Sequence, residues 1–215
     1  MRKKILAAVL SLCLLAALLS GCAFGKKSVD PVGVWSMDVQ DTPEQAKVLL
    51  DAIDVYEEEI ALADLNSLFY VKQAHFREDG TFAFFVDAEG TRAGVHAFFD
   101  GFFHTLYENR VSLNEVYSRT FDDMSEADFQ QFYAELYGYE SYAVMTETFT
   151  ESAYQYEVFD APAKEGTYTV RGDVILCTAS GETEPSGIQV VISGDSSEYL
   201  TMVYADGEET YTRIR

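Results

Sequence analysis

Cysteine and basic residues are scarce in this sequence. Its 215 residues include three cysteines, and 15 Lys and Arg stand against 36 Asp and Glu, a formal charge of −21. Because each phosphate contact needs a Lys or Arg, this charge excludes a nucleic-acid-binding protein. Cys13 lies in an apolar leader and Cys22 follows that leader directly, so only Cys177 remains in the body of the chain. No disulfide framework can therefore form within one chain.

The patterns of common catalytic and metal sites are also missing. The sequence has no Gly-x-Ser-x-Gly elbow, phosphate-binding loop or calcium loop. His96 and His104 would lie about 12 Å apart along one helix, and neither pairs with His75 at zinc-ligand spacing. The consecutive acids Glu57–Glu59 do not converge on one face, so we expect them to be solvated. We therefore expect no enzyme activity, no metal and no cofactor, and we interpret Cys177 as core filler in an apolar run.

The one long apolar run lies at the N-terminus. Three basic residues, 2–4, precede an apolar stretch from Ile5 to Leu19, and small residues follow it. This order is typical of a secretory signal, and the run is too short for a permanent membrane span. We predict that residues 1–21 are a signal peptide. The remaining 194 residues would hold 12 Lys and Arg against 36 Asp and Glu, a charge of −24.

The residues at the end of the leader, Leu19-Ser20-Gly21-Cys22, resemble a bacterial lipobox. The resemblance implies that the chain is cut before Cys22, which then carries acyl chains, palmitate among them. The alternative is an ordinary secretory signal with a chance cysteine at the cleavage site. Residues 22–32 would be a lipid-anchored tether. The expected location is the extracytoplasmic side of a bacterial cell membrane, with the membrane as a partner through the lipid anchor.

Short strand-like segments bounded by turn residues occur in two blocks of the body, residues 33–215. Trp35, Met37 and Val39 alternate with polar or smaller residues, which predicts a first strand with one apolar face. Asp79-Gly80 joins two apolar runs and indicates a hairpin. The predicted strands are 33–39, 68–77, 81–87, 166–170, 174–178, 188–193, 198–205 and 208–215. About eight strands with short turns favour a small antiparallel up-and-down barrel.

Two helical segments interrupt these strands, at about 42–66 and 91–155. Thr42, Pro43 and Gln45 predict a capped helix start, and Ser112-x-x-Glu115 and Ser125-x-x-Asp128 resemble further capping boxes. Residues 91–160 contain 17 of the 30 aromatic residues, which indicates a packed insertion rather than a linker. The expected class is mainly β with an α insertion, α+β.

The motifs of the strand blocks resemble the lipocalin-like domains of bacterial lipoproteins. They are Gly33-Val-Trp35, Phe76-Arg-Glu-Asp-Gly-Thr-Phe82, Gly166-Thr-Tyr168, Gly172-Asp-Val-Ile-Leu176 and Glu209-Thr-Tyr-Thr-Arg213. They cover about half of the mature chain. The resemblance implies a barrel that encloses a pocket for a small apolar molecule. It also implies a structural pair at the barrel base, in which Arg213 stacks on Trp35 as a cation–π partner.

The aromatic insertion leaves two interpretations open. Its aromatic residues form a helical core, or some of them, Phe99, Phe102, Phe103, Phe132 and Tyr133, line the mouth of the barrel and bind ligand. We expect a membrane-anchored lipoprotein that binds a small apolar or amphipathic ligand in the barrel. The alternative is a non-enzymatic module that uses the helical insertion to bind a cell-envelope protein.

Overall fold

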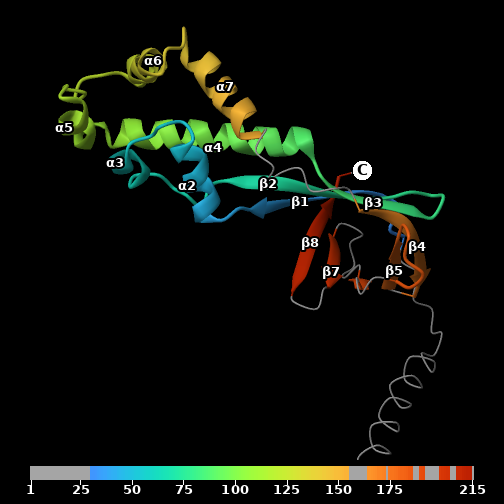
Figure 1. The fold of residues 1–215 in the computed structure, drawn as a ribbon. Coiled ribbons are helices and arrows are strands. Elements are labelled where there is room, and N and C mark those ends of the chain that lie inside the picture. Colours follow the sequence, from blue (N-terminus) through green and yellow to red (C-terminus); the bar gives the residue numbers. More distant parts are fainter. Residues whose placement is uncertain are drawn as a thin grey trace, which may run out of the picture.

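The computed structural model describes residues 30–154, 164–172, 174–185, 189–191, 199–203 and 207–214 (Figure 1). A curled antiparallel sheet forms one end of the molecule, and helices extend from it as a separate layer. The predicted α+β class is confirmed. The predicted signal peptide, Cys22 and most of the predicted tether lie outside the described residues. Within the described ranges, no helix combines the length and the apolar character needed to cross a bilayer.

The strands follow one another around the sheet in chain order. Each strand pairs antiparallel with the next, and β8 pairs back with β1 at Trp35↔Arg213 and Ser36↔Thr212. The strands are β1 (Gly33–Gln40), β2 (Phe69–Phe76), β3 (Thr81–Val86), β4 (Lys164–Arg171), β5 (Val174–Ala179), β6 (Gln189–Val191), β7 (Tyr199–Val203) and β8 (Glu208–Arg213). This order of pairing confirms the barrel-like antiparallel sheet.

The first hairpin turn has the conformation that its residues predict. Gly80 has φ 80°, a left-handed backbone conformation that favours glycine. The Asp79 carboxylate accepts hydrogen bonds from the backbone N–H and the hydroxyl of Thr81, at 2.9 and 2.6 Å. These contacts fix the register between β2 and β3, and they lower the pKa of Asp79.

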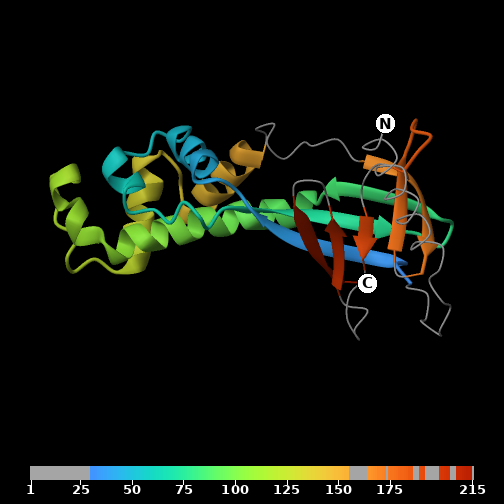
Figure 2. The ribbon, with the colours of Figure 1, turned by 90° about the horizontal axis from the view of Figure 1, so that it is seen from below.

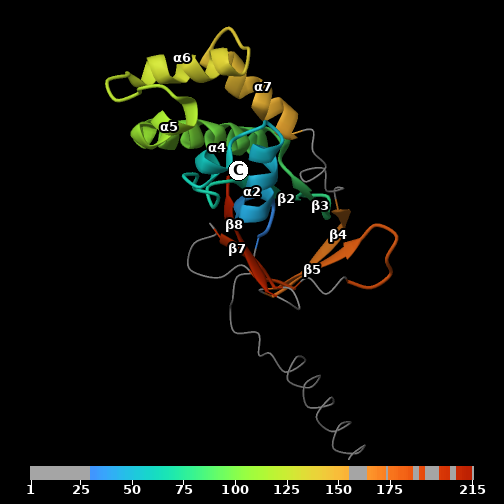
Figure 3. The same cartoon turned by 60° about the vertical axis from the view of Figure 1, so that its left-hand side comes forward.

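The helices emerge in two groups from the same end of the sheet. Between β1 and β2 lie α2 (Pro43–Asp51) and α3 (Glu57–Ile60). Between β3 and β4 lie α4 (Ala88–Glu108), the 3-10 turn η1 (Arg110–Leu113), α5 (Asn114–Tyr117), α6 (Glu126–Leu136) and α7 (Tyr142–Tyr154). Figures 2 and 3 show both groups gathered beside the sheet. We call α2–α7 the helical arm.

The structure confirms two of the predicted helix caps and contradicts a third. Thr42 and Ser125 cap α2 and α6, because their hydroxyls accept from the backbone N–H groups of Gln45 and Asp128. The Ser112 prediction is wrong, since Ser112 lies inside η1 and α5 begins after Leu113 without a side-chain cap. The single segment predicted at 42–66 is two helices, since the chain turns at Asp54 with φ 57°.

Helix α4 lies directly against the outer face of β2. The Thr91 hydroxyl accepts a hydrogen bond from the backbone N–H of Val71 at 3.0 Å. A Cβ atom added to Gly94 would come within 2.6 Å of the Phe69 carbonyl oxygen, so only glycine permits this approach. The arm is therefore joined to the sheet by close backbone packing.

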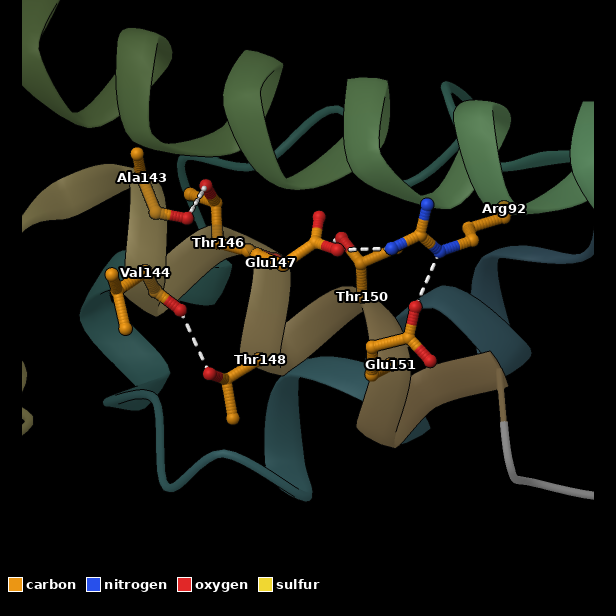
Figure 4. Close-up of polar contacts among 8 residues, drawn as sticks. All are labelled: Arg92, Ala143, Val144, Thr146, Glu147, Thr148, Thr150 and Glu151. Atoms are coloured by element: carbon orange, nitrogen blue, oxygen red, sulfur yellow. Dashed lines mark hydrogen bonds and ion pairs between the residues drawn. The ribbon is translucent and has the colours of Figure 1, made fainter.

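Ion pairs join α7 to α4 on the exposed side of the arm. Arg92 of α4 pairs with Glu147 and Glu151, which are one helical turn apart on α7 (Figure 4). The Thr148 hydroxyl on α7 donates to the carbonyl of Val144 at 2.7 Å. All three charged side chains are about half exposed, so solvent weakens this contact.

Two separate groups of buried apolar side chains stabilise the molecule. The arm core is built from α2–α7 and the loops between them, and includes Leu49, Leu50, Phe99 and Phe129. The sheet core lies on the inner face of the curled sheet and includes Trp35, Phe76, Phe82, Ile175, Cys177, Leu200, Met202 and Tyr211. Each layer of the molecule therefore has a hydrophobic core of its own.

Candidate functional site

The five aromatic residues considered as ligand contacts belong to the arm core. Phe99, Phe102, Phe103 and Tyr133 are at most 3% exposed, and Phe132 is half-buried against the same core. Of the two interpretations, the one that placed these residues at the mouth of the barrel is therefore not supported. The physical reason is that the helices bury these rings against one another, as the Phe103–Tyr133 contact at 5.2 Å between ring centroids shows. The structure thus agrees with the alternative of a helical core.

Phe132 also borders an open groove at the far end of the arm. The groove has a volume of about 560 Å³ and lies between the loop after α5 and helix α6. The Arg119 guanidinium lies 4.8 Å from the centre of the Phe132 ring. Three carboxylates, of Asp123, Asp128 and Glu135, line the same groove. The groove is a polar surface with one aromatic wall.

A buried carboxylate in the arm was missed by the sequence analysis. Glu59, expected to be solvated, is 0% exposed. Its carboxylate accepts hydrogen bonds from the hydroxyls of Tyr117, at 2.7 Å, and Tyr133, and from the backbone N–H of Tyr56 at 3.1 Å. Burial, and next the charge of Glu59, raises the pKa of Tyr133. No local signal marked Glu59, because Tyr56 is not a capping-box residue and the tyrosine partners of Glu59 lie 58 and 74 residues further along the chain.

The strand register shows which residues lie on the inner face of the sheet. Residues that pair directly lie on the same face, and alternate residues along a strand share that face. Trp35 pairs with Ala74 and Arg213, Met37 pairs with Lys72, and Met202 pairs with Glu209. The inner face therefore also includes charged residues, Lys72 and Glu209 among them.

One end of this face is closed by the predicted pair. The Arg213 guanidinium lies 4.5 Å from the centre of the Trp35 ring, so the predicted cation–π contact is present. Arg213 also donates to the carbonyl of Asp30 at 2.8 Å, and the Trp35 indole N–H donates to the carbonyl of Pro31 at 2.9 Å. We call this end of the sheet the base.

Apolar side chains fill the space above the base. Phe76, Phe82 and Ile175 are at most 2% exposed. Cys177 is buried with them, as predicted, and burial raises the pKa of its thiol to about 12. The charge of Lys164 acts in the opposite direction. A thiol with so high a pKa is a poor nucleophile at neutral pH.

The opposite end of the inner face, where both helical groups leave the sheet, carries an ion pair. We call this end the mouth. Lys72 Nζ lies 2.6 Å from Glu209 Oε1, and the Tyr211 hydroxyl donates to Glu209 Oε2 at 3.0 Å. The side chains of Lys72 and Glu209 are 31% and 22% exposed. Half-buried Met37 and Phe84 pack against the buried residues Phe76, Phe82, Ile175 and Cys177, which we call the floor. Polar groups above an apolar floor are typical of small-molecule sites.

The three histidines are not brought together. His75 lies on the outer face of β2 and hydrogen-bonds Gln73 at 2.8 Å. His96 and His104 lie on α4, beside Asp100 and Glu126 respectively. The hydrogen bond with Glu126 raises the pKa of His104. In the described parts of the chain, no three His, Cys, Asp or Glu side chains are grouped as metal ligands would be.

Comparison with known proteins finds no matching protein-family model, no matching curated protein and no matching solved structure.

Proposed function

We propose that this chain is an extracytoplasmic lipoprotein, anchored in a bacterial cell membrane through Cys22, whose lipocalin-like barrel binds a small amphipathic molecule at the mouth. The leader and the sequence Leu19–Cys22 support the anchor. The pairing of β8 with β1 supports a complete barrel, since it joins the last strand to the first.

The main support for this proposal is that the inner face of the sheet changes from apolar residues in its interior to charged and polar residues at the mouth. The residues above the base, Phe76, Phe82, Ile175 and Cys177, are apolar and buried, while the mouth holds Lys72, Glu209 and Tyr211 beside half-buried Met37 and Phe84. An apolar tail would meet the floor, and a polar head would meet the charged pair. The contacts come from the strands rather than from the five aromatic residues of the arm.

A pair of matched tryptophan variants tests the location. Met37→Trp adds bulk on the inner face at the mouth, whereas Thr210→Trp adds the same bulk on the exposed outer face of β8. Residues 23–215 would be titrated with fluorescent lipids of several classes and inspected by native mass spectrometry. We expect saturable one-to-one binding in the parent chain and Thr210→Trp, and at least about tenfold weaker binding in Met37→Trp. Absence of saturable binding in the parent chain, or equal affinities in both variants, would contradict the proposal.

The groove of the arm favours a second candidate function, a protein-interaction or envelope-accessory module. Residues 41–68 and 88–154 hold 20 Asp and Glu against 4 Lys and Arg, so a basic partner fits this surface best. A photo-crosslinking residue at Gln131 lies in the groove, and one at Thr210 serves as the control. A single basic envelope protein joined from position 131 alone would support this function. Equal labelling from both positions would count against it.

A further inference from the structure

Two arginines at the far end of the arm are used differently. Arg110 donates hydrogen bonds to the backbone carbonyls of Phe121 and Asp122, at 3.0 and 2.9 Å. The exposed Arg119, by contrast, makes no side-chain hydrogen bond or ion pair within the described residues. A guanidinium carries five N–H donors and no acceptor. Arg110 is therefore used by the fold, whereas the donors of Arg119 are open to a ligand.

Aromatic rings hold the Arg119 guanidinium in position. Its central carbon lies 4.8 Å from the centre of the Phe132 ring and 5.7 Å from that of Phe121. The loop that carries it is fixed by Asn114, whose backbone carbonyl accepts from the Arg119 N–H at 3.0 Å and whose side-chain oxygen accepts from the Phe121 N–H at 2.9 Å. Because stacking uses the face of the guanidinium, the N–H groups in its plane stay available, and a forked pair of them matches a carboxylate.

The groove beside Arg119 also holds carboxylates that do not pair with it. Asp123, Asp128 and Glu135 line the groove, which has a volume of about 560 Å³, within the range of ligand sites. One oxygen of Asp128 and one of Glu135 accept from a nearby side chain. Asp123 is exposed and has neither a hydrogen bond nor an ion pair in the described parts of the chain. The groove thus presents a cationic fork and a free carboxylate that do not neutralise each other.

The charges of the groove indicate what fits it best. Three carboxylates and one guanidinium line it, so a ligand with a single anionic group and more than one cationic group is complementary. The C-terminal end of a basic polypeptide has this combination. Its terminal carboxylate is present in every chain, and Lys or Arg side chains lie next to it. Capture of the terminal carboxylate is a recurring mode of peptide recognition, and the open side of the groove leaves room for the rest of the chain.

We propose that the groove binds the C-terminal end of a basic polypeptide, with the terminal carboxylate on Arg119 and a neighbouring Lys or Arg side chain on Asp123. This inference rests on the second candidate function, a basic partner at the arm, and specifies which part of that partner is recognised.

The test compares three peptides that carry fluorescein at the N-terminus. One ends in Ala-Ala-Lys-Lys with a free carboxylate, the second is the same peptide amidated at the C-terminus, and the third ends in Ala-Ala-Gln-Gln with a free carboxylate. Residues 23–215 would be titrated into each and binding followed by fluorescence anisotropy. We expect saturable binding of the first peptide and about tenfold weaker binding of each of the other two, because each lacks one of the two charge-assisted contacts.

Matched variants then assign the two contacts to the groove. Arg119→Lys keeps the charge but removes the fork, and should lower the affinity for the free acid toward that for the amide. Asp123→Asn should weaken both lysine peptides several-fold. Two controls at exposed positions outside the groove, Arg171→Lys on β4 and Glu44→Gln on α2, should change neither affinity.

Two results would overturn the inference, and they differ in what else they remove. If the amidated peptide binds as tightly as the free acid, recognition of the terminus is wrong, while a basic partner at the arm stands. If neither lysine peptide binds, the inference and the second candidate function both fail.

Discussion

Each layer of the molecule contains charged groups inside its fold, and the two sets differ in how they are satisfied. Glu59 of the arm is 0% exposed and receives three hydrogen bonds. Lys72 and Glu209 of the sheet are partly exposed, and the lysine retains donors. A buried charge whose partners are complete stabilises one structure. A partly exposed charge with donors remaining can bind something else. Glu59 is therefore satisfied within the fold, whereas the Lys72 ammonium keeps N–H donors at a partly exposed position.

Removal of an aromatic ring from the arm core should have the largest effect on stability. Phe103→Ala removes a side chain that is 1% exposed and contacts Tyr133 and Phe149. We expect the free energy of unfolding to fall by about 3–5 kcal/mol, measured by urea denaturation. Val111→Ala, at an exposed position of the arm, is the control and should change it by less than about 0.5 kcal/mol. A stable Phe103→Ala variant would show that the arm core does not hold the molecule together.

The next test compares the two sets of charges directly. Glu59→Gln removes a charge that three donors stabilise, and we expect a loss of about 2 kcal/mol in the free energy of unfolding. Lys72→Met/Glu209→Gln removes a complete ion pair at similar volume and should cost less than about 1 kcal/mol. Thermal and urea unfolding of both variants check this order. The reverse order would make the pair at the mouth structural.

Alkaline pH should expose the role of the tyrosines around Glu59. Burial raises the pKa of Tyr117 and Tyr133 above the usual 10 in the folded state. Above that pH the unfolded chain loses protons that the folded chain keeps. The free energy of unfolding should therefore fall by about 1.4 kcal/mol per pH unit for each tyrosine. Tyr133→Phe should remove the contribution of one proton from this slope, about 1.4 kcal/mol per pH unit. The slope is measured by urea denaturation at several alkaline pH values, and a slope equal to that of the parent chain would contradict the prediction.

A smaller loss is expected at the base of the sheet. Arg213→Ala removes the stacking on Trp35 and the hydrogen bond to Asp30. The free energy of unfolding should fall by about 1 kcal/mol. Arg171→Ala, an exposed arginine on β4, is the control. An unchanged melting temperature for Arg213→Ala would show that the pair is not structural.

The smallest effect is expected at the exposed ion pairs of the arm. Arg92→Ala breaks the contacts with Glu147 and Glu151, whose side chains are about half exposed. The melting temperature should fall by less than in Arg213→Ala, and the difference should vanish at about 1 M salt, which screens surface charges. A large loss that persists in salt would contradict this expectation.

The strands were predictable because their signals are local, whereas the base was predicted from a resemblance. The alternation of Trp35, Met37 and Val39 identifies β1, and Asp79-Gly80 identifies the first hairpin. Trp35 and Arg213 were paired through a resemblance to lipocalin-like domains. Ser125 was recognised as a cap because its partner, Asp128, is three residues away.

The mouth and the Glu59 cluster depend on contacts that the sequence does not place side by side. Lys72 and Glu209 are 137 residues apart in sequence. They meet because β2 and β8 both pair with β1, so that their side chains reach each other across the inner face of β1. Glu59 lies in one helical group, and its tyrosine partners lie in the other. The sequence left open whether the aromatic residues of the insertion form a helical core or line the mouth, because the burial of their rings depends on residues of both helical groups.

The base determines where the N-terminal segment reaches the folded body. Asp30 and Pro31 are held there by Arg213 and Trp35, at the opposite end of the inner face from the mouth. The segment from Cys22 to Asp30 can span at most about 28 Å when fully extended. A lipid anchor at Cys22 would therefore keep the base within about 28 Å of the bilayer surface. The helical arm, at the other end of the sheet, would be the part of the body that reaches furthest from the membrane when the tether is extended.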